Sequence, residues 1–137
     1  DAVKPGVTTW EIDRIVRKMI EDAGAKPSFL GYGGFPASAC VSVNETVVHG
    51  IPDERTILKD GDIVTVDLCA YKNGYHGDAC RTFCIGDVAP ETRKLVKVTE
   101  ECFFKGVEGL RAGTSLYDIG YKVQRYAESF GYGVIRS

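Results

Sequence analysis

The stretch that decides the fold is IVTVDLCAY (residues 63–71), followed after Lys72-Asn73-Gly74 by YHGDACRTFCI (residues 75–85). The first segment is mostly apolar and alternates in character, which predicts a buried β-strand. Asn-Gly is the strongest short-range signal for a two-residue type I′ hairpin turn. We therefore predict that the chain reverses at this dipeptide and that the two segments form an antiparallel hairpin.

The turn also predicts which residues face each other across the hairpin. Pairing Lys72 with Tyr75 places Asp67 opposite Cys80, with Asp78 two residues before Cys80 on the returning strand. Because strand side chains alternate between faces, both aspartates project from the same side. As diagonal neighbours, their Cβ atoms are roughly 7 Å apart or less. Two anions this close in an apolar setting repel, so one takes up a proton or a cation lies between them. We predict a divalent metal site.

A structural alternative remains open for each aspartate. A buried Asp in a strand can simply accept hydrogen bonds from backbone N–H groups or from an arginine such as Arg81. A slip of one residue in the hairpin register would also place the two carboxylates on opposite faces. The metal interpretation therefore depends on the register.

Size and composition limit the classes of function. The 137 residues are enough for one domain, with 44% hydrophobic and 26% charged residues, as in ordinary globular proteins. A net charge of −2 and a pI near 5.7 argue against nucleic acid as the main partner. No apolar run reaches membrane-spanning length and no signal peptide is visible, so we expect no membrane partner.

The five cysteines follow no disulfide-framework spacing, and their odd number favours a reducing cytoplasm. Cys80 and Cys84 form a tempting zinc pair, but four residues along a strand span about 13 Å, too far for one tetrahedral ion. We expect most of the cysteines to be core residues.

Three amphipathic stretches predict helices, and one apolar stretch predicts a further strand. The first helix opens at a capping box formed by Thr8 and Glu11 and ends at Gly24. The other predicted elements are a helix over 90–110 that begins with Pro90, a helix over 115–131 whose box is completed by Asp118, and a strand over 41–48.

The first and third predicted helices form an internal repeat. An offset of 107 aligns Gly6 with Gly113 and Gly24 with Gly131, with five identities in nineteen positions. Coincidental similarity between amphipathic helices remains an alternative. If the repeat is real, residues 1–112 form one α/β half and residues 113–137 open a second half that is otherwise missing. The uncovered central face is then expected to drive self-association.

The segment between the first helix and the hairpin contains FLGYGGFP (residues 29–36). Its glycines allow close backbone approach and its aromatic residues offer walls, so it predicts a small apolar pocket, with a packed loop as the alternative. Further on, His49 precedes Gly50 at a predicted strand end. It is either an ordinary surface residue or, near a metal site, a proton donor or oxyanion stabiliser.

Five motifs along the chain resemble one known family. They are Tyr32-x-Gly-Phe-Pro36, Ser42-Val-Asn-Glu45, His49-Gly-Ile-Pro52, Asp62-Ile-Val-x-Val-Asp67 and Gly77-Asp78-x-x-Arg-Thr82. In this order they resemble type I methionine aminopeptidase of the bacterial kind. The resemblance implies the α/β (α+β) pita-bread fold of creatinases and aminopeptidases, in which two pseudo-symmetric halves with antiparallel sheets and covering helices enclose a dinuclear metal centre. The implied activity removes the initiator methionine from nascent polypeptide N-termini.

The resemblance also implies roles for single residues. Asp67 would chelate one of two divalent ions and Asp78 would bridge both, and His49 would contact the substrate and help to stabilise the intermediate. Manganese, iron(II) and cobalt suit carboxylate ligands, and zinc is an alternative. The methionine side-chain pocket would be lined by Phe29, Tyr32, Phe35 and Cys40.

Two smaller expectations follow from the same resemblance, and a third, for His76, follows from the hairpin face. Some members carry a histidine where Gly33 stands, so a hydrogen bond to substrate is expected to be absent here. A monovalent cation is expected on backbone carbonyls near Asn44 and Thr46. His76, on the face of the two aspartates, is a candidate to orient a carboxylate.

The departure from the family pattern concerns the remaining ligands. The family's histidine and two further glutamates lie in its C-terminal half, so we expect this chain alone to be inactive or nearly so. Two alternatives stay open at this point. One is a pita-bread binding module without catalysis, although such relatives usually lose the carboxylates that are present here. The other is a prolidase- or creatinase-like relative, a group with a long extra N-terminal domain.

Overall fold

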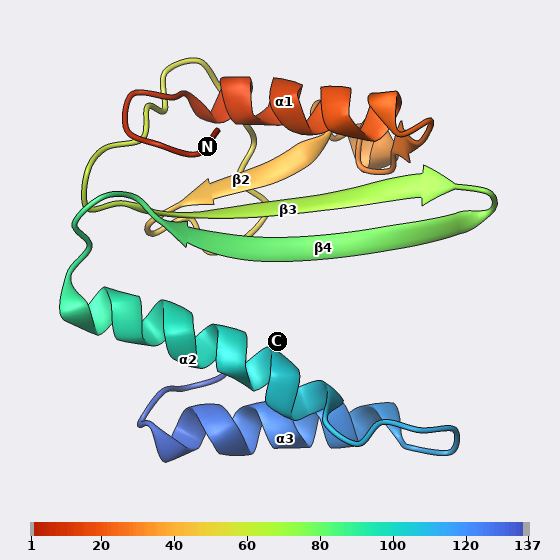
Figure 1. Ribbon diagram of the computed structural model, residues 1–137, viewed down its shortest axis with the longest axis vertical. Helices are drawn as coiled ribbons and strands as arrows, with labels where there is room; N and C mark the ends of the chain where they lie inside the picture. Colours follow the sequence, from red (N-terminus) through yellow and green to blue (C-terminus); the bar gives the residue numbers. More distant parts are fainter. Residues whose placement is uncertain (1, 136–137) are drawn as a thin grey trace. The chain divides into compact units, whose positions relative to one another are not determined.

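A computed structural model describes residues 2–135 and shows an α+β protein with one antiparallel sheet (Figure 1). The chain forms two compact units, one ending at Val88 and the other beginning at Ala89. In chain order the elements are α1 (Thr9–Asp22), β1 (Lys26–Pro27), the short 3-10 helix η1 (Tyr32–Gly34), β2 (Ala39–Val43), β3 (Ile63–Lys72), β4 (Tyr75–Cys84), α2 (Pro90–Val107) and α3 (Leu116–Ser129).

The β3–β4 hairpin confirms the predicted turn and register. Lys72 pairs with Tyr75, and Asp67 lies opposite Cys80. Both turn residues have positive φ, with 53° at Asn73 and 87° at Gly74, as a type I′ turn requires. The face on which each hairpin side chain lies therefore follows directly from this turn.

β3 is the central strand of the sheet. β4 pairs with one edge of β3 along its whole length, so β1 and β2 share the other edge at different ends. β2 pairs with β3 so that Cys40 lies opposite Asp67. Three neighbouring strands thus contribute to one row of side chains, with Asp67 in the middle.

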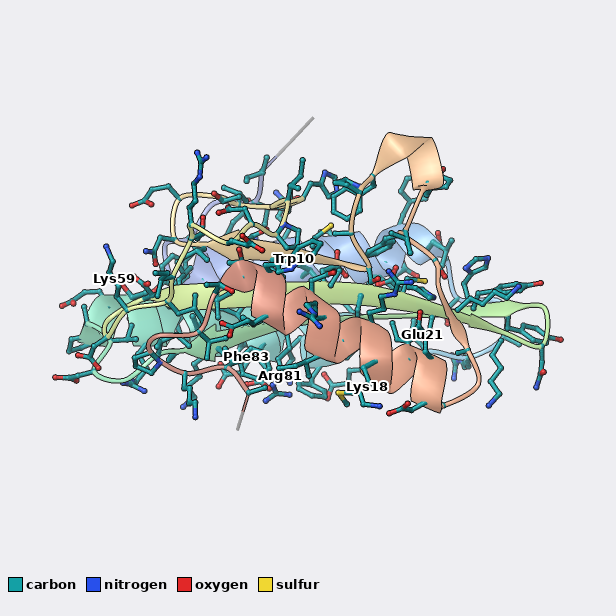
Figure 2. All side chains as sticks on the ribbon, turned by 90° about the horizontal axis from the view of Figure 1, so that it is seen from above. Trp10, Lys18, Glu21, Lys59, Arg81 and Phe83 are labelled. Atoms are coloured by element: carbon teal, nitrogen blue, oxygen red, sulfur yellow. The ribbon has the colours of Figure 1, made fainter. Side chains whose placement is uncertain are left out.

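One face of the sheet is covered by α1. Figure 2 looks onto this side, with α1 in front of the sheet. The apolar stripe of α1 meets alternate strand residues there, and the buried core consists of Ile12, Val16, Ile20, Ala39, Val41, Leu58, Val64, Val66 and Ile85. Because side chains alternate, Asp67 and Asp78 lie on the opposite face of the same strands.

The N-terminus of α1 has the predicted capping box. The Thr8 hydroxyl accepts from the Glu11 N–H at 3.1 Å, and the Glu11 carboxylate accepts from the Thr8 N–H at 2.8 Å. This reciprocal pair satisfies two of the backbone donors that every helix N-terminus leaves open. It sets the start of the helix that covers the sheet.

The predicted strand over 41–48 is wrong in extent, because β2 begins at Ala39 and ends at Val43. Asn44 has φ 49°, and its side chain accepts from the Ile63 N–H and donates to Asp62. Asn tolerates this left-handed conformation, so the chain leaves the sheet there. The helices are shorter than predicted by two or three residues at their C-termini, and β1 and η1 were not predicted.

In the second unit, α2 and α3 pack through a small apolar cluster of Val98, Cys102 and Ala127. Gly106 allows the close approach, since a Cβ there would lie 2.9 Å from Val123 Cγ2. The Ser115 hydroxyl caps α3 by accepting from the Tyr117 N–H, and the predicted capping box with Asp118 is wrong because the Asp118 N–H donates to the Ser115 carbonyl. Within residues 2–135, no helix is both long enough and apolar enough to cross a membrane.

The two helices of the predicted repeat agree in local structure. α1 and α3 each have 14 residues and begin 107 positions apart. The glycines before them, Gly6 and Gly113, have φ of 87° and 89°, and those after them, Gly24 and Gly131, have 67° and 81°. The division into halves at residue 112 stays a prediction, and it differs from the boundary of the compact units at residues 88 and 89.

Candidate active site

Asp67 lies in the row of side chains that crosses three strands. Cys40 of β2 faces it from one side and Cys80 of β4 from the other. Asp78 lies opposite Cys69, two residues further along β3, and is therefore a diagonal neighbour of Asp67 on the same face. The condition for the metal interpretation, two carboxylates on one face, is met.

The alternative interpretation, in which an arginine such as Arg81 pairs with a buried aspartate, does not fit the register of the hairpin. It pairs with Val66, whose side chain lies in the core under α1, so Arg81 is on the face opposite the two aspartates. An ion pair between this arginine and either carboxylate across the sheet is excluded by the alternation of strand side chains.

The surroundings of Asp67 alter the pKa of this carboxyl group. Burial raises the pKa of Asp67 above its ordinary value, the negative charge of Asp78 raises it further, and a hydrogen bond with Asp78 acts in the same direction. The nearby His49 lowers the pKa of Asp67, which places the imidazole within electrostatic range. A divalent ion between the carboxylates would relieve the repulsion that raises the pKa of Asp67.

The two flanking thiols are kept protonated by the same surroundings. Burial raises the pKa of Cys40 and of Cys80, and the charges of Asp67 and Asp78 raise both further. The thiolate is the form that binds metals and attacks electrophiles, so these cysteines are neutral neighbours of the carboxylates at neutral pH.

Across residues 2–135, no group of three or more His, Cys, Asp or Glu side chains is arranged to hold a metal ion. Asp67 and Asp78 fit a divalent ion in charge and position, but they are only two ligands. His76 is not placed as a third ligand. Its Nδ1 instead lies 2.9 Å from the Ser28 hydroxyl and 3.9 Å from Cys69 Sγ. Whether it also orients a carboxylate stays a prediction.

A cavity of about 600 Å³ lies beside Asp67 in the first unit. Its lining contains all four residues predicted for a methionine pocket, together with His49 and Asp67. The residues that line it are Phe29, Tyr32, Gly33, Gly34, Phe35, Pro36, Cys40, His49, Ile51 and Asp67. The glycine-rich loop therefore contributes a wall of this cavity.

The aromatic walls of this cavity are held by the loop around η1. The rings of Phe29 and Phe35 meet edge to face with centroids 6.4 Å apart. Gly33 has φ 56° and open space where a Cβ would lie, so this position of the lining carries no side chain. Gly34 and Pro36 belong to the segment 29–36 that was predicted to form a pocket, whereas Ile51 was missed in the sequence.

His49 is exposed at the cavity and has φ 58°, which is unusual for a residue with a side chain. The next residue, Gly50, is buried against β2. The monovalent cation near Asn44 and Thr46 stays a prediction. The backbone N–H groups of Asn44 and Thr46 donate to Ile63 and Val43, respectively.

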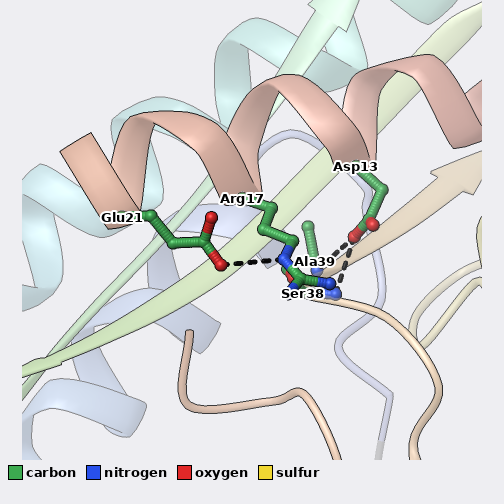
Figure 3. A network of polar contacts seen from close by, with 5 residues as sticks. All are labelled: Asp13, Arg17, Glu21, Ser38 and Ala39. Carbon is green, nitrogen blue, oxygen red and sulfur yellow. Dashed lines mark hydrogen bonds and ion pairs between the residues drawn. The ribbon is translucent and has the colours of Figure 1, made fainter. Parts of the chain in front are cut away.

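Asp13 supports the site from the other face and was missed in the sequence. This buried carboxylate accepts from the N–H groups of Ser38 and Ala39 at 2.7 and 2.8 Å (Figure 3). These two residues start β2, the strand that carries Cys40. The signal in the sequence was a charged residue within the apolar stripe of the first helix, next to Ile12.

Comparisons with known proteins agree on one family. The chain matches Metallopeptidase family M24 over residues 1–137. Methionine aminopeptidase of Clostridium acetobutylicum is 56% identical over 135 residues, 98% of this chain and 54% of that protein. Methionine aminopeptidase 1 of Bacillus subtilis is 46% identical over 98% of this chain and 54% of that protein. The chain thus spans about half the length of these relatives.

Solved structures give the same result for the fold. Methionine aminopeptidase from Rickettsia prowazekii superposes with a TM-score of 0.93 at 43% identity, over 98% of this chain and 54% of that chain. For an Xaa-Pro dipeptidase from Bacillus anthracis the TM-score is 0.81 at 26% identity, over 96% and 35%. These proteins share the pita-bread fold, so the predicted fold class is confirmed.

Proposed function

Because the chain belongs to metallopeptidase family M24, we propose that it forms the methionine-recognising portion of a metal-dependent methionine aminopeptidase. The substrates of this activity are nascent polypeptides that begin with methionine. The observation that carries the proposal is the meeting of two same-face carboxylates, an exposed histidine and an aromatic cavity at one place. The names and identities of the relatives support the same reaction.

The cavity is suited to the side chain of an N-terminal methionine. Its lining combines the aromatic rings of Phe29 and Phe35 with the polar side chains of His49 and Asp67. An unbranched thioether packs well against aromatic rings, with sulfur–aromatic contacts worth about 0.3–1.5 kcal/mol. A substrate held in this way presents its first peptide bond toward His49 and Asp67.

Asp67 and Asp78 are the residues of this chain that would hold divalent metal, for which manganese, iron(II), cobalt and zinc are the candidates. When bound, such an ion supplies Lewis acidity and a water of lowered pKa. His49 donates a hydrogen bond to the carbonyl oxygen of the scissile bond and stabilises the negative charge that develops there. The aromatic wall keeps bulk water away from the methionine side chain.

We further propose that the 137-residue chain has little or no activity by itself. Two carboxylates are fewer ligands than a dinuclear centre requires, and the matched relatives are about twice as long. The remaining ligands would come from a second half, of which residues 113–137 form the opening helix. We also propose that the chain associates with itself through the sheet face that the second half would cover. A monovalent cation near Asn44 and Thr46 belongs to the same proposal. So does a cytoplasmic location, which the odd number of cysteines supports.

A binding test separates this proposal from a catalytically silent binding module. Manganese binding to the chain, measured by calorimetry, is expected to weaken at least 10-fold in Asp67→Asn and in Asp78→Asn. Asp22→Asn is the matched control, because Asp22 is an exposed carboxylate on α1 whose partner is Lys18. Equal affinity in all four proteins contradicts the assignment of the metal ligands.

An activity test uses a hybrid in which this chain is joined to the unmatched remainder of the Clostridium acetobutylicum relative. The hybrid is expected to release methionine from Met-Ala-Ser, whereas the 137-residue chain is expected to release none above background. A hybrid that is folded and loaded with metal but has no activity contradicts the proposed reaction. Release by the chain alone contradicts the proposed need for a second half.

A further inference from the structure

The loop that carries His49 becomes buried at the residue that follows the histidine. Residues 44–49 are all exposed, whereas Gly50 is buried. The Gly50 N–H donates to the Ser42 hydroxyl at 3.0 Å, and the Gly50 carbonyl accepts from the Val41 N–H at 2.9 Å. Gly50 therefore attaches the loop to the edge of β2 that does not face β3.

The attachment allows no side chain at residue 50. A Cβ on Gly50 would lie 2.3 Å from the Val41 carbonyl oxygen and 2.9 Å from Ser42 Cα. The residue has an ordinary φ, so this position requires glycine because of close approach and not because of backbone conformation. Backbone and hydroxyl contacts alone hold the loop at this point.

The attachment acts on His49 because the two residues are adjacent. His49 has φ 58°, a left-handed conformation that is strained for a residue with a side chain. Such a conformation persists only where the surrounding structure imposes it. The buried neighbour, with both of its backbone polar groups bonded to β2, is the part of the structure that imposes it.

β2 also connects His49 with Asp67. Cys40 of β2 pairs with Asp67, and Ser42 lies two residues further along the same strand. One short strand therefore carries the pairing partner of the carboxylate and the hydroxyl that holds the loop. β2 thereby links the loop that carries the imidazole to the strand that carries the carboxylate.

We propose that Ser42 is a positioning residue for His49: its buried hydroxyl holds Gly50 against β2 and so fixes the imidazole at the cavity beside Asp67. The catalytic consequence rests on the proposed function, because it assumes the role of His49 in peptide-bond cleavage. The placement of His49 is a property of the chain and is tested without activity.

The structural test uses NMR on the 137-residue chain. In Ser42→Ala, the Cα and Cβ chemical shifts and the HN–Hα coupling constant of His49 are expected to move away from the values typical of a left-handed backbone. Ser42→Thr keeps a hydroxyl and is expected to retain the wild-type values. Ser38→Ala is the matched control. Ser38 lies on the same side of the strand and is fully buried, but its hydroxyl has no hydrogen-bond partner among the described residues. Unchanged His49 signals in Ser42→Ala overturn the proposal.

A second measurement needs no variant and covers the case in which Ser42→Ala does not fold. In the wild-type chain the Gly50 amide is expected to exchange with solvent about 10-fold or more slowly than the amides of Val47 and Val48, because it is buried and bonded. Equal exchange rates at the three residues show that Ser42 does not hold the loop.

The catalytic consequence is measured in the hybrid enzyme. Ser42→Ala is expected to lower kcat about 10- to 100-fold, since small displacements of reacting groups have effects of this size, with KM changed less than about 2-fold. Ser42→Thr is expected to recover most of kcat, and Ser38→Ala to keep it. A Ser42→Ala hybrid with wild-type kcat contradicts the positioning role, whereas an inactive wild-type hybrid contradicts only the proposed function.

Discussion

Removing the Asp13 carboxylate is expected to destabilise the first unit strongly. Asp13 is 3% exposed and accepts two backbone N–H groups, those of Ser38 and Ala39, which are also buried. Hydrogen bonds to charged groups contribute about 1.5–3 kcal/mol each, and a buried donor left without a partner costs a comparable amount. For two such donors, Asp13→Ala is expected to lower the free energy of unfolding by about 3–6 kcal/mol. This is a large part of the roughly 5–15 kcal/mol that stabilises a typical domain.

The assay is urea unfolding followed by circular dichroism, with the slope m compared between variants. Asp13→Asn keeps one acceptor oxygen, loses the charge and replaces the second oxygen with an NH2 group, so a loss of about 1 kcal/mol is expected. Asp22→Ala on the same helix removes an exposed ion pair with Lys18 and is expected to change stability by less than about 0.5 kcal/mol. An Asp13→Ala protein within 1 kcal/mol of wild type, at unchanged m, refutes the role given to this carboxylate.

Three further predictions concern the second unit and the carboxylate pair. Gly106→Ala is expected to destabilise the α2–α3 pair by about 1–3 kcal/mol, because the added methyl group overpacks against Val123. The measurement is thermal unfolding, and an unchanged Tm shows that the two helices accommodate the methyl group without cost. The metal-free chain is expected to lose stability as pH rises from the ordinary pKa of an aspartate, 3.8, through the raised pKa of Asp67, because the folded state binds the proton more tightly in this range. In Asp78→Asn this loss of stability is expected to be smaller. If the wild-type chain and Asp78→Asn show the same dependence of Tm on pH between about 3.5 and 7, the charge of Asp78 does not act on Asp67. Manganese is expected to raise the Tm of the wild-type chain and EDTA to reverse the rise, with no such response in Asp67→Asn.

Much of the site could be predicted from local sequence because a hairpin is a local structure. Asn73-Gly74 sets the turn, the turn sets the register, and the register places Asp67 and Asp78 on one face. The helix caps at Thr8 and Ser115 are equally local, since each involves residues two or three positions apart. Alternation and capping depend only on neighbouring residues, so they could be derived without knowledge of the rest of the chain.

What only the tertiary structure decided involves residues far apart in the chain. β2 ends at Val43 because Asn44 bonds to Asp62 and Ile63, which come 18 and 19 positions later. Asp13 is buried because it meets the backbone of residues 25 and 26 positions away. The place of His49 at the cavity depends on the contact of Gly50 with β2, and nothing in the periodicity of a loop encodes such a contact. Local patterns thus determined which side chains share a face, and packing between distant segments determined the cavity beside them.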